Sequence, residues 1–64
     1  MPVIRVEMFA GRSVDQKREL VAALTQETAR IAKCDPASVF VVIDDVAKEN
    51  WGVGGMLASD KFPG

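Results

Sequence analysis

The stretch VFVVI at residues 39–43 decides the fold of this 64-residue chain. It is continuously apolar and rich in β-branched side chains, which is typical of a central strand covered on both faces. Asp44 and Asp45 follow directly, and we expect them to return the chain to solvent. The stretch therefore predicts a buried strand, and the rest of the chain must supply what pairs with it and covers it.

The residues before this strand, from Val14 to about Lys33, place apolar side chains at helical spacing with no interrupting Gly or Pro. Ser13 and Gln16 have the spacing of a capping box, which favours a helix that begins here. Asp35-Pro36 ends the helix, because the residue before a proline avoids the helical region, and starts a short helical turn. The apolar stripe consists of Leu20, Leu24, Thr28 and Ile31, widened by Val21 and Ala32.

A second strand is predicted over residues 3–9, where the side chains alternate between two faces. Strand, long helix and strand in this order form a βαβ unit with parallel strands and a right-handed crossover. Residues 49–56 have the composition of a hairpin around Trp51, and residues 57–64 carry no periodic signal, as expected of a loose tail or an arm onto a neighbour. We therefore expect a single α+β domain: a small βαβ subunit with parallel strands and a C-terminal hairpin, spanning residues 1–64.

One helix covers only one face of this sheet, so the other face of residues 39–43 would lie open to water. A chain of this length buries only about 60% of its unfolded surface, while 48% of its residues are hydrophobic. Pairing of subunits would extend the sheet, and layering of such pairs would cover the open face. We therefore expect the sheet to be completed by homo-oligomerisation; the number of copies does not follow from this argument.

The composition excludes several classes of function. The chain has no His and a single Cys, Cys34, which excludes a zinc site of the usual ligands and Ser-His-Asp or Cys-His catalysis. Its net charge is −1, whereas a nucleic-acid-binding protein would show a basic stripe. We find no signal pattern and no apolar run of membrane length. We therefore expect a cytoplasmic protein that binds no metal, nucleic acid or membrane.

Pro2 is the candidate base in a chain without His. Removal of Met1 would leave the secondary amine of the proline as the amino terminus. A free α-amine has a pKa near ~7.7–8.0, and an apolar pocket lined by cations disfavours its charged form. The lowered pKa would make Pro2 a general base at working pH. The alternative is that Pro2 only suits the start of a strand.

Four segments, taken together and in order, carry a resemblance to a known family. They are PVIRV at residues 2–6, GRSVDQK at 11–17, VVIDDVAK at 41–48 and WGVGG at 51–55. From Pro2 to about Ser59 the chain resembles the 4-oxalocrotonate tautomerase family without a gap. The resemblance implies a βαβ subunit that assembles into dimers and then a hexamer. It also implies a proline base that moves a proton between carbons of a dienol or unsaturated 2-oxo acid, with no cofactor and no metal.

The resemblance assigns roles to five residues of this chain. Pro2 stands at the position of the catalytic proline, and Arg12 at that of an arginine that binds a substrate carboxylate. Trp51 and Phe9 stand at apolar positions that enclose the site. Phe40 replaces a second arginine of the best-characterised members, which is expected to favour a smaller or monocarboxylic enol over a dicarboxylate. The substrate that the resemblance implies is 2-hydroxymuconate, in aromatic hydrocarbon catabolism.

Two alternatives stay open at this point. A dehalogenase or decarboxylase of the same superfamily, acting on a small unsaturated or 3-oxo acid, would also use an amino-terminal proline. It needs a water-activating carboxylate or a second arginine, and neither Met8-Phe9 nor Trp51-Gly52-Val53 supplies one. A non-catalytic oligomeric module would carry Pro2 only as a strand start. Arg12 would then be a solvated turn cation and Trp51 an interface side chain.

Overall fold

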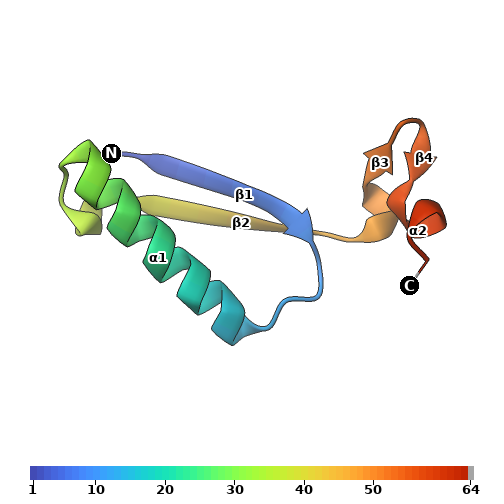
Figure 1. The fold of residues 1–64 in the computed structure, drawn as a ribbon, viewed down its shortest axis with the longest axis horizontal. Coiled ribbons are helices and arrows are strands. Elements are labelled where there is room, and N and C mark those ends of the chain that lie inside the picture. The colour runs from blue at the N-terminus through green and yellow to red at the C-terminus, as the bar shows by residue number, and fades with distance from the viewer. Residues whose placement is uncertain (64) are drawn as a thin grey trace.

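Two parallel strands and one long helix form the body of the protein. In the computed structural model, which describes residues 1–63, β1 (Val3–Phe9) pairs with β2 (Phe40–Val46), and α1 (Val14–Ala32) connects them across one face (Figure 1). The register runs from Val3 opposite Phe40 to Phe9 opposite Val46. The predicted α+β fold, a βαβ unit with parallel strands, is confirmed.

β2 continues to Val46, beyond its predicted end. Asp44 and Asp45 therefore lie in the strand, so its predicted end at Ile43 was wrong, although both residues are exposed to solvent as expected. Each carboxylate has a cation within reach: Asp45 pairs with Lys17 of α1, and Asp44 pairs with Arg5 of β1 at 3.4 Å. These pairs allow acidic side chains to occupy strand positions, and the Lys17 pair also ties the start of α1 to β2.

The ends of α1 follow from local hydrogen bonding. The Ser13 hydroxyl accepts a hydrogen bond from the Gln16 N–H at 3.1 Å, and the Gln16 side chain accepts one from the Ser13 N–H at 2.9 Å. At the other end, Lys33 takes a left-handed conformation with φ of 54°. The short 3₁₀ turn η1 (Pro36–Ser38) follows, with Asp35 as its cap. The predicted capping box, helix and short turn are confirmed.

The apolar stripe of α1 is covered along most of its length but not at its end. Leu20, Leu24 and Thr28 are half-buried, and Ala29 is buried. Ile31 is 69% exposed, so its predicted place in the core was wrong for the single chain. The 19-residue helix is about 28 Å long and the 7-residue β1 spans about 23 Å, so the helix is longer than the sheet that it covers.

The face of the sheet turned away from α1 is open. Val3, Phe40 and Val42 lie on it and are 57%, 51% and 40% exposed, and we call these three side chains the open face. The prediction that residues 39–43 are covered on both faces is therefore not met within one chain. The exposed row of apolar side chains is the surface that homo-oligomerisation was expected to cover.

A small C-terminal unit follows β2. It consists of the 3₁₀ turn η2 (Lys48–Asn50), the strands β3 (Gly52–Val53) and β4 (Met56–Leu57), and the helix α2 (Ala58–Lys61). The predicted hairpin is confirmed, and Gly54 and Gly55 make its turn at φ of 58° and 87°, which favours glycine. α2 was not predicted, because so short a helix shows no apolar period. Of the predicted tail, residue 64 lies outside the described residues.

This C-terminal unit lies beyond the end of the sheet rather than on it (Figure 1). The radius of gyration is 14.8 Å, whereas a compact chain of this length would have about 11 Å. Within residues 1–63, Ala29 and Ala58 are the only buried apolar residues, and no helix combines the length and apolarity needed to cross a membrane. A single chain thus has little fully buried core and leaves several large apolar side chains, among them Val3, Ile31 and Phe40, exposed.

Candidate functional site

Pro2 lies at the end of the sheet where β1 begins. It is half-buried, and its carbonyl accepts a hydrogen bond from the Phe40 N–H at 3.0 Å. This bond continues the parallel ladder by one step, so Pro2 and Phe40 are fixed beside each other. Proline suits the first position of a strand because its nitrogen has no N–H to give to the ladder. Two of the predicted site residues are thus neighbours.

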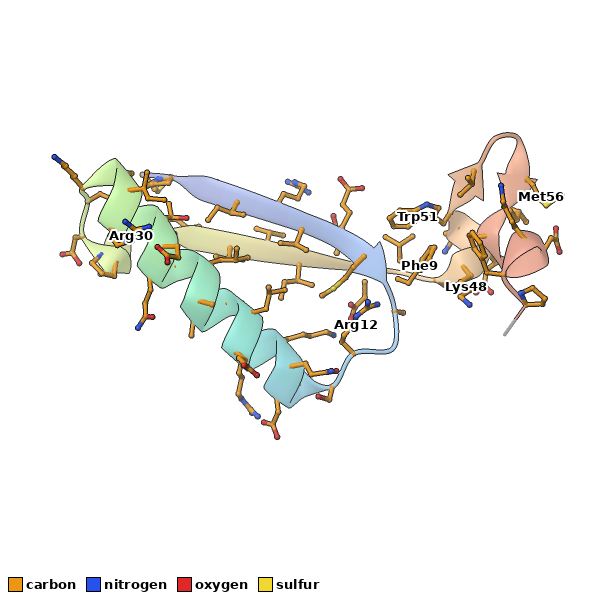
Figure 2. All side chains as sticks on the ribbon, viewed as in Figure 1. Phe9, Arg12, Arg30, Lys48, Trp51 and Met56 are labelled. Carbon is orange, nitrogen blue, oxygen red and sulfur yellow. The ribbon has the colours of Figure 1, made fainter. Side chains whose placement is uncertain are left out.

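Arg12 lies at the opposite end of β1, in the connection that leads into α1 (Figure 2). Its guanidinium Nη1 donates a hydrogen bond to the Phe9 carbonyl at 3.0 Å. Gly11 has φ of 127°, a conformation that other residues rarely adopt, and Ser13 caps the helix. A glycine turn and a helix cap therefore flank Arg12. A guanidinium has five N–H donors, so one bond to a carbonyl leaves donors for a carboxylate.

Phe9 and Trp51 form an aromatic wall near Arg12 (Figure 2). Their rings meet edge to face, with centroids 4.6 Å apart and planes at 63°. The Trp51 N–H donates to the Lys48 carbonyl at 3.3 Å, and the Trp51 carbonyl accepts from the Ala58 N–H at 2.7 Å. Backbone bonds on both sides thus hold Trp51, and three of the predicted site residues form a second cluster.

A shallow depression of about 200 Å³ lies against this wall, lined by Glu7, Val46, Asn50, Trp51 and Gly52. Glu7 supplies the only acidic group of this lining. Neither Glu7 nor Asn50 was predicted as a site residue. The alternation of β1 places Glu7 on the same side as Phe9, and that is the signal in the sequence that points to it. No comparable signal marks Asn50.

The two clusters lie at opposite ends of β1. Pro2 precedes the strand and Phe9 ends it, which separates them by about 23 Å at ~3.3 Å per residue. A small acid cannot contact Pro2 and Arg12 of the same chain at once. The five predicted site residues are therefore brought together as two groups, Pro2 with Phe40 and Phe9 with Arg12 and Trp51, and not as one pocket.

Charged side chains elsewhere form surface pairs. The exposed pairs are Arg5–Asp44, Arg18–Asp15 and Arg30–Glu27. Pairs of this kind contribute little to stability. Across residues 1–63, no three His, Cys, Asp or Glu side chains gather as a metal ion would require, and Cys34 is a half-buried free thiol. The chemistry of interest therefore concentrates at the two ends of β1.

Known proteins resemble the chain over nearly its whole length. Residues 2–61 match the family model described as "Tautomerase enzyme". A protein of Halalkalibacterium halodurans named "Probable tautomerase" is 36% identical over 61 residues, covering 95% of this chain and 100% of its own length. The 2-hydroxymuconate tautomerase of Comamonas testosteroni is 37% identical over 60 residues, covering 94% of this chain and 95% of its own. A solved structure of a heterohexameric 4-oxalocrotonate tautomerase from Chloroflexus aurantiacus is 35% identical, with a TM-score of 0.86 over 94% of this chain and 97% of that one.

Proposed function

The chain belongs to the tautomerase family, and we propose that it is a cofactor-independent keto–enol tautomerase in which Pro2, freed by removal of Met1, is the general base. The observation that carries this proposal is the Arg12 guanidinium, held on the Phe9 carbonyl at 3.0 Å next to the aromatic wall. A fixed guanidinium beside apolar rings suits an acid with one carboxylate and a conjugated apolar body.

The proton transfer needs only the amine of Pro2. The amine takes the hydroxyl proton of a 2-hydroxydienoate, and the electron pair of that O–H bond forms the carbonyl. The carbon–carbon double bonds shift, and a distal carbon takes the proton back from the prolyl ammonium. No atom is gained or lost and no electron acceptor is needed. Once a second copy covers the open face, the Pro2 amine would lie in apolar surroundings, where burial disfavours its charged form.

Arg12 and the aromatic wall supply binding and electrostatic help. A bidentate guanidinium holds the substrate carboxylate and favours the build-up of negative charge toward that end of the conjugated chain. Phe9 and Trp51 shield the site from water, which strengthens both effects. We assign Arg12, Phe9, Trp51 and Phe40 to substrate binding, with Phe40 lining the apolar side next to Pro2.

The separation of the two clusters has a consequence for assembly. Because about 23 Å separates Pro2 from Phe9, whose carbonyl holds the Arg12 guanidinium, a complete site requires Pro2 of one copy and Arg12 of another. The open face and the missing core favour the same conclusion, and the Chloroflexus aurantiacus relative is described as a heterohexamer. We therefore propose a homo-oligomer, a dimer or a hexamer, whose sites lie between subunits.

The substrate class follows from the charges available. The Comamonas testosteroni relative is a 2-hydroxymuconate tautomerase, and 2-hydroxymuconate is therefore the first compound to test. Phe40 places an aromatic ring, and no cation, on the Pro2 side of the site. One anchoring guanidinium suits one carboxylate, so the enol of a monocarboxylic 2-oxo acid is expected to be the better substrate.

The proposal is tested by following enol ketonisation through its ultraviolet absorbance. The protein must first be shown by intact mass to lack Met1, because an acylated Pro2 nitrogen cannot act as a base. We expect acceleration of 2-hydroxymuconate ketonisation, and greater acceleration with a monocarboxylic enol. If neither enol reacts faster than in a sample of heat-denatured protein, the proposed function is wrong.

A further inference from the structure

Lys48 joins parts of the chain that lie far apart in sequence. It opens η2, and its half-buried side chain lies between the aromatic wall and the C-terminal tail (Figure 2). Its Nζ lies 5.9 Å from the centroid of the Phe9 ring and donates a hydrogen bond to the Phe62 carbonyl at 2.9 Å. One ammonium group thus contacts β1 and the residue that follows α2.

The backbone of Lys48 contacts the other half of the wall. Its carbonyl accepts a hydrogen bond from the Trp51 N–H at 3.3 Å. Trp51 in turn packs edge to face on Phe9, whose ring lies under the Lys48 ammonium. Lys48, Phe9 and Trp51 therefore form a closed cycle of three contacts, in which Lys48 is the only charged member.

This cycle bears on the anchor for the substrate. The Phe9 carbonyl holds the Arg12 guanidinium at 3.0 Å, so a shift of Phe9 would move Arg12 as well. A cation above an aromatic face is attracted by the negative face of the ring, and the attraction is stronger where water is partly excluded. A neutral side chain of the same length would fill the same space but would not attract the ring.

We propose that Lys48 is a positioning residue: it holds the Phe9–Trp51 wall in place, and through the Phe9 carbonyl it sets how tightly Arg12 binds the substrate carboxylate. The expected effect on KM rests on the proposed function. The expected effect on the Phe9–Trp51 wall rests on the contacts alone. The hydrogen bond to the Phe62 carbonyl also links Lys48 to the residue that follows α2. Displacement of the tail is then expected to weaken substrate binding without touching Pro2.

The test compares Lys48→Met with Lys48→Arg, and with Lys61→Met as a matched control. Lys61 is an exposed lysine of α2, so its replacement removes the same charge from the same unit. Trp51 is the only tryptophan and the chain has no tyrosine, so fluorescence emission and acrylamide quenching report on the wall directly. The kinetic readout is kcat and KM for whichever test enol the wild-type protein ketonises.

We expect Lys48→Met to shift Trp51 emission to longer wavelength, to increase quenching, and to raise KM about fivefold with little change in kcat. Lys48→Arg keeps the charge and should restore both readouts, and Lys61→Met should match the wild type. If Lys48→Met does not fold, as judged by circular dichroism, Lys48→Gln takes its place, because it keeps a donor for Phe62 without the charge.

Wild-type emission and wild-type KM in the neutral variant would overturn the proposal. So would equal changes in Lys48→Arg and Lys48→Met, which would show that the charge has no part in the effect. If the wild-type protein ketonises no enol, the proposed function fails instead, while Trp51 emission and quenching still decide whether Lys48 holds the wall.

Discussion

Replacing Pro2 with alanine is expected to lower kcat for enol ketonisation by about 10²–10⁴-fold, the usual contribution of a general base. Alanine after Met1 removal also presents an amine, but a primary one on a residue whose φ is not fixed by a ring. The base would therefore lose both its basicity and its orientation. The Phe40 N–H can still donate to the carbonyl of residue 2, so the fold should be kept. The measurement is the ultraviolet assay of enol ketonisation, made on protein whose intact mass shows that Met1 has been removed.

A second form of the wild-type protein serves as control for this variant. Protein that retains Met1 has the Pro2 nitrogen in a peptide bond, so it should be as inactive as Pro2→Ala although its Pro2 side chain is unchanged. Undiminished activity of Pro2→Ala, or of the form that keeps Met1, would show that the Pro2 amine is not the base. The non-catalytic alternative predicts that neither Pro2→Ala nor Arg12→Ala changes any measured property.

Placing a carboxylate on the open face is expected to weaken both assembly and activity strongly. Val42 lies on β2 between Phe40 and Asp44, which are the register partners of Val3 and Glu7. A carboxylate there would lie opposite Arg5, which already pairs with Asp44, and burying this additional charge against a second copy costs several kcal/mol, which weakens association by about 10²-fold or more. Because each site would need two copies, Val42→Asp should elute at a smaller size in sizing chromatography and lose activity in proportion.

Val14→Asp is the matched control for this substitution. Val14 is also exposed, at 60%, but it is the first residue of α1, where an acidic side chain interacts favourably with the helix dipole. The same charge is added away from the open face, so size and activity should stay as in the wild type. An active Val42→Asp of wild-type size would mean that the open face is not the interface, and that the site needs another explanation.

Local patterns predicted most of the fold. The capping box at Ser13 and Gln16 acts between neighbours in the chain, so its residues alone locate the start of α1. The extent of β2 depended on long-range pairing: Asp45 stays in the sheet opposite Met8 and pairs with Lys17 of another element. The exposure of Ile31 depends on the length of α1 relative to the strands. Neither the extent of β2 nor the exposure of Ile31 can be predicted from a short stretch of sequence.

The candidate site was predicted as a set of residues but not as an arrangement. The resemblance pointed to Arg12, and the structure places its guanidinium on the Phe9 carbonyl. The distance between Pro2 and Phe9 follows from the length of β1, and under the proposed function a second copy must therefore complete the site. Lys48 could not be identified from the sequence, because its partners, Phe9 and Phe62, are distant from it along the chain.

One observation favours the alternative function as a dehalogenase or decarboxylase. It needs a water-activating carboxylate or a second arginine, and Glu7 lies in the depression beside Trp51. Its place on β1 next to Phe9 is at the end of the strand away from Pro2. Glu7 of one copy would therefore have to join Pro2 of another, as Arg12 must. Tautomerisation needs no water and no such carboxylate, and it remains the function that the contacts support best.

A subunit-mixing experiment tests the central claim, that Pro2 and Arg12 of different copies form one site. Pro2→Ala and Arg12→Ala, each nearly inactive alone, are unfolded together in equal amounts, refolded and assayed for enol ketonisation. If a site takes Pro2 from one copy and Arg12 from another, about a quarter of the sites in the random mixture are intact, and activity should recover to that level. If both residues served the same site from one chain, every site would carry a defect, and activity no higher than the sum of the two variants would contradict the account.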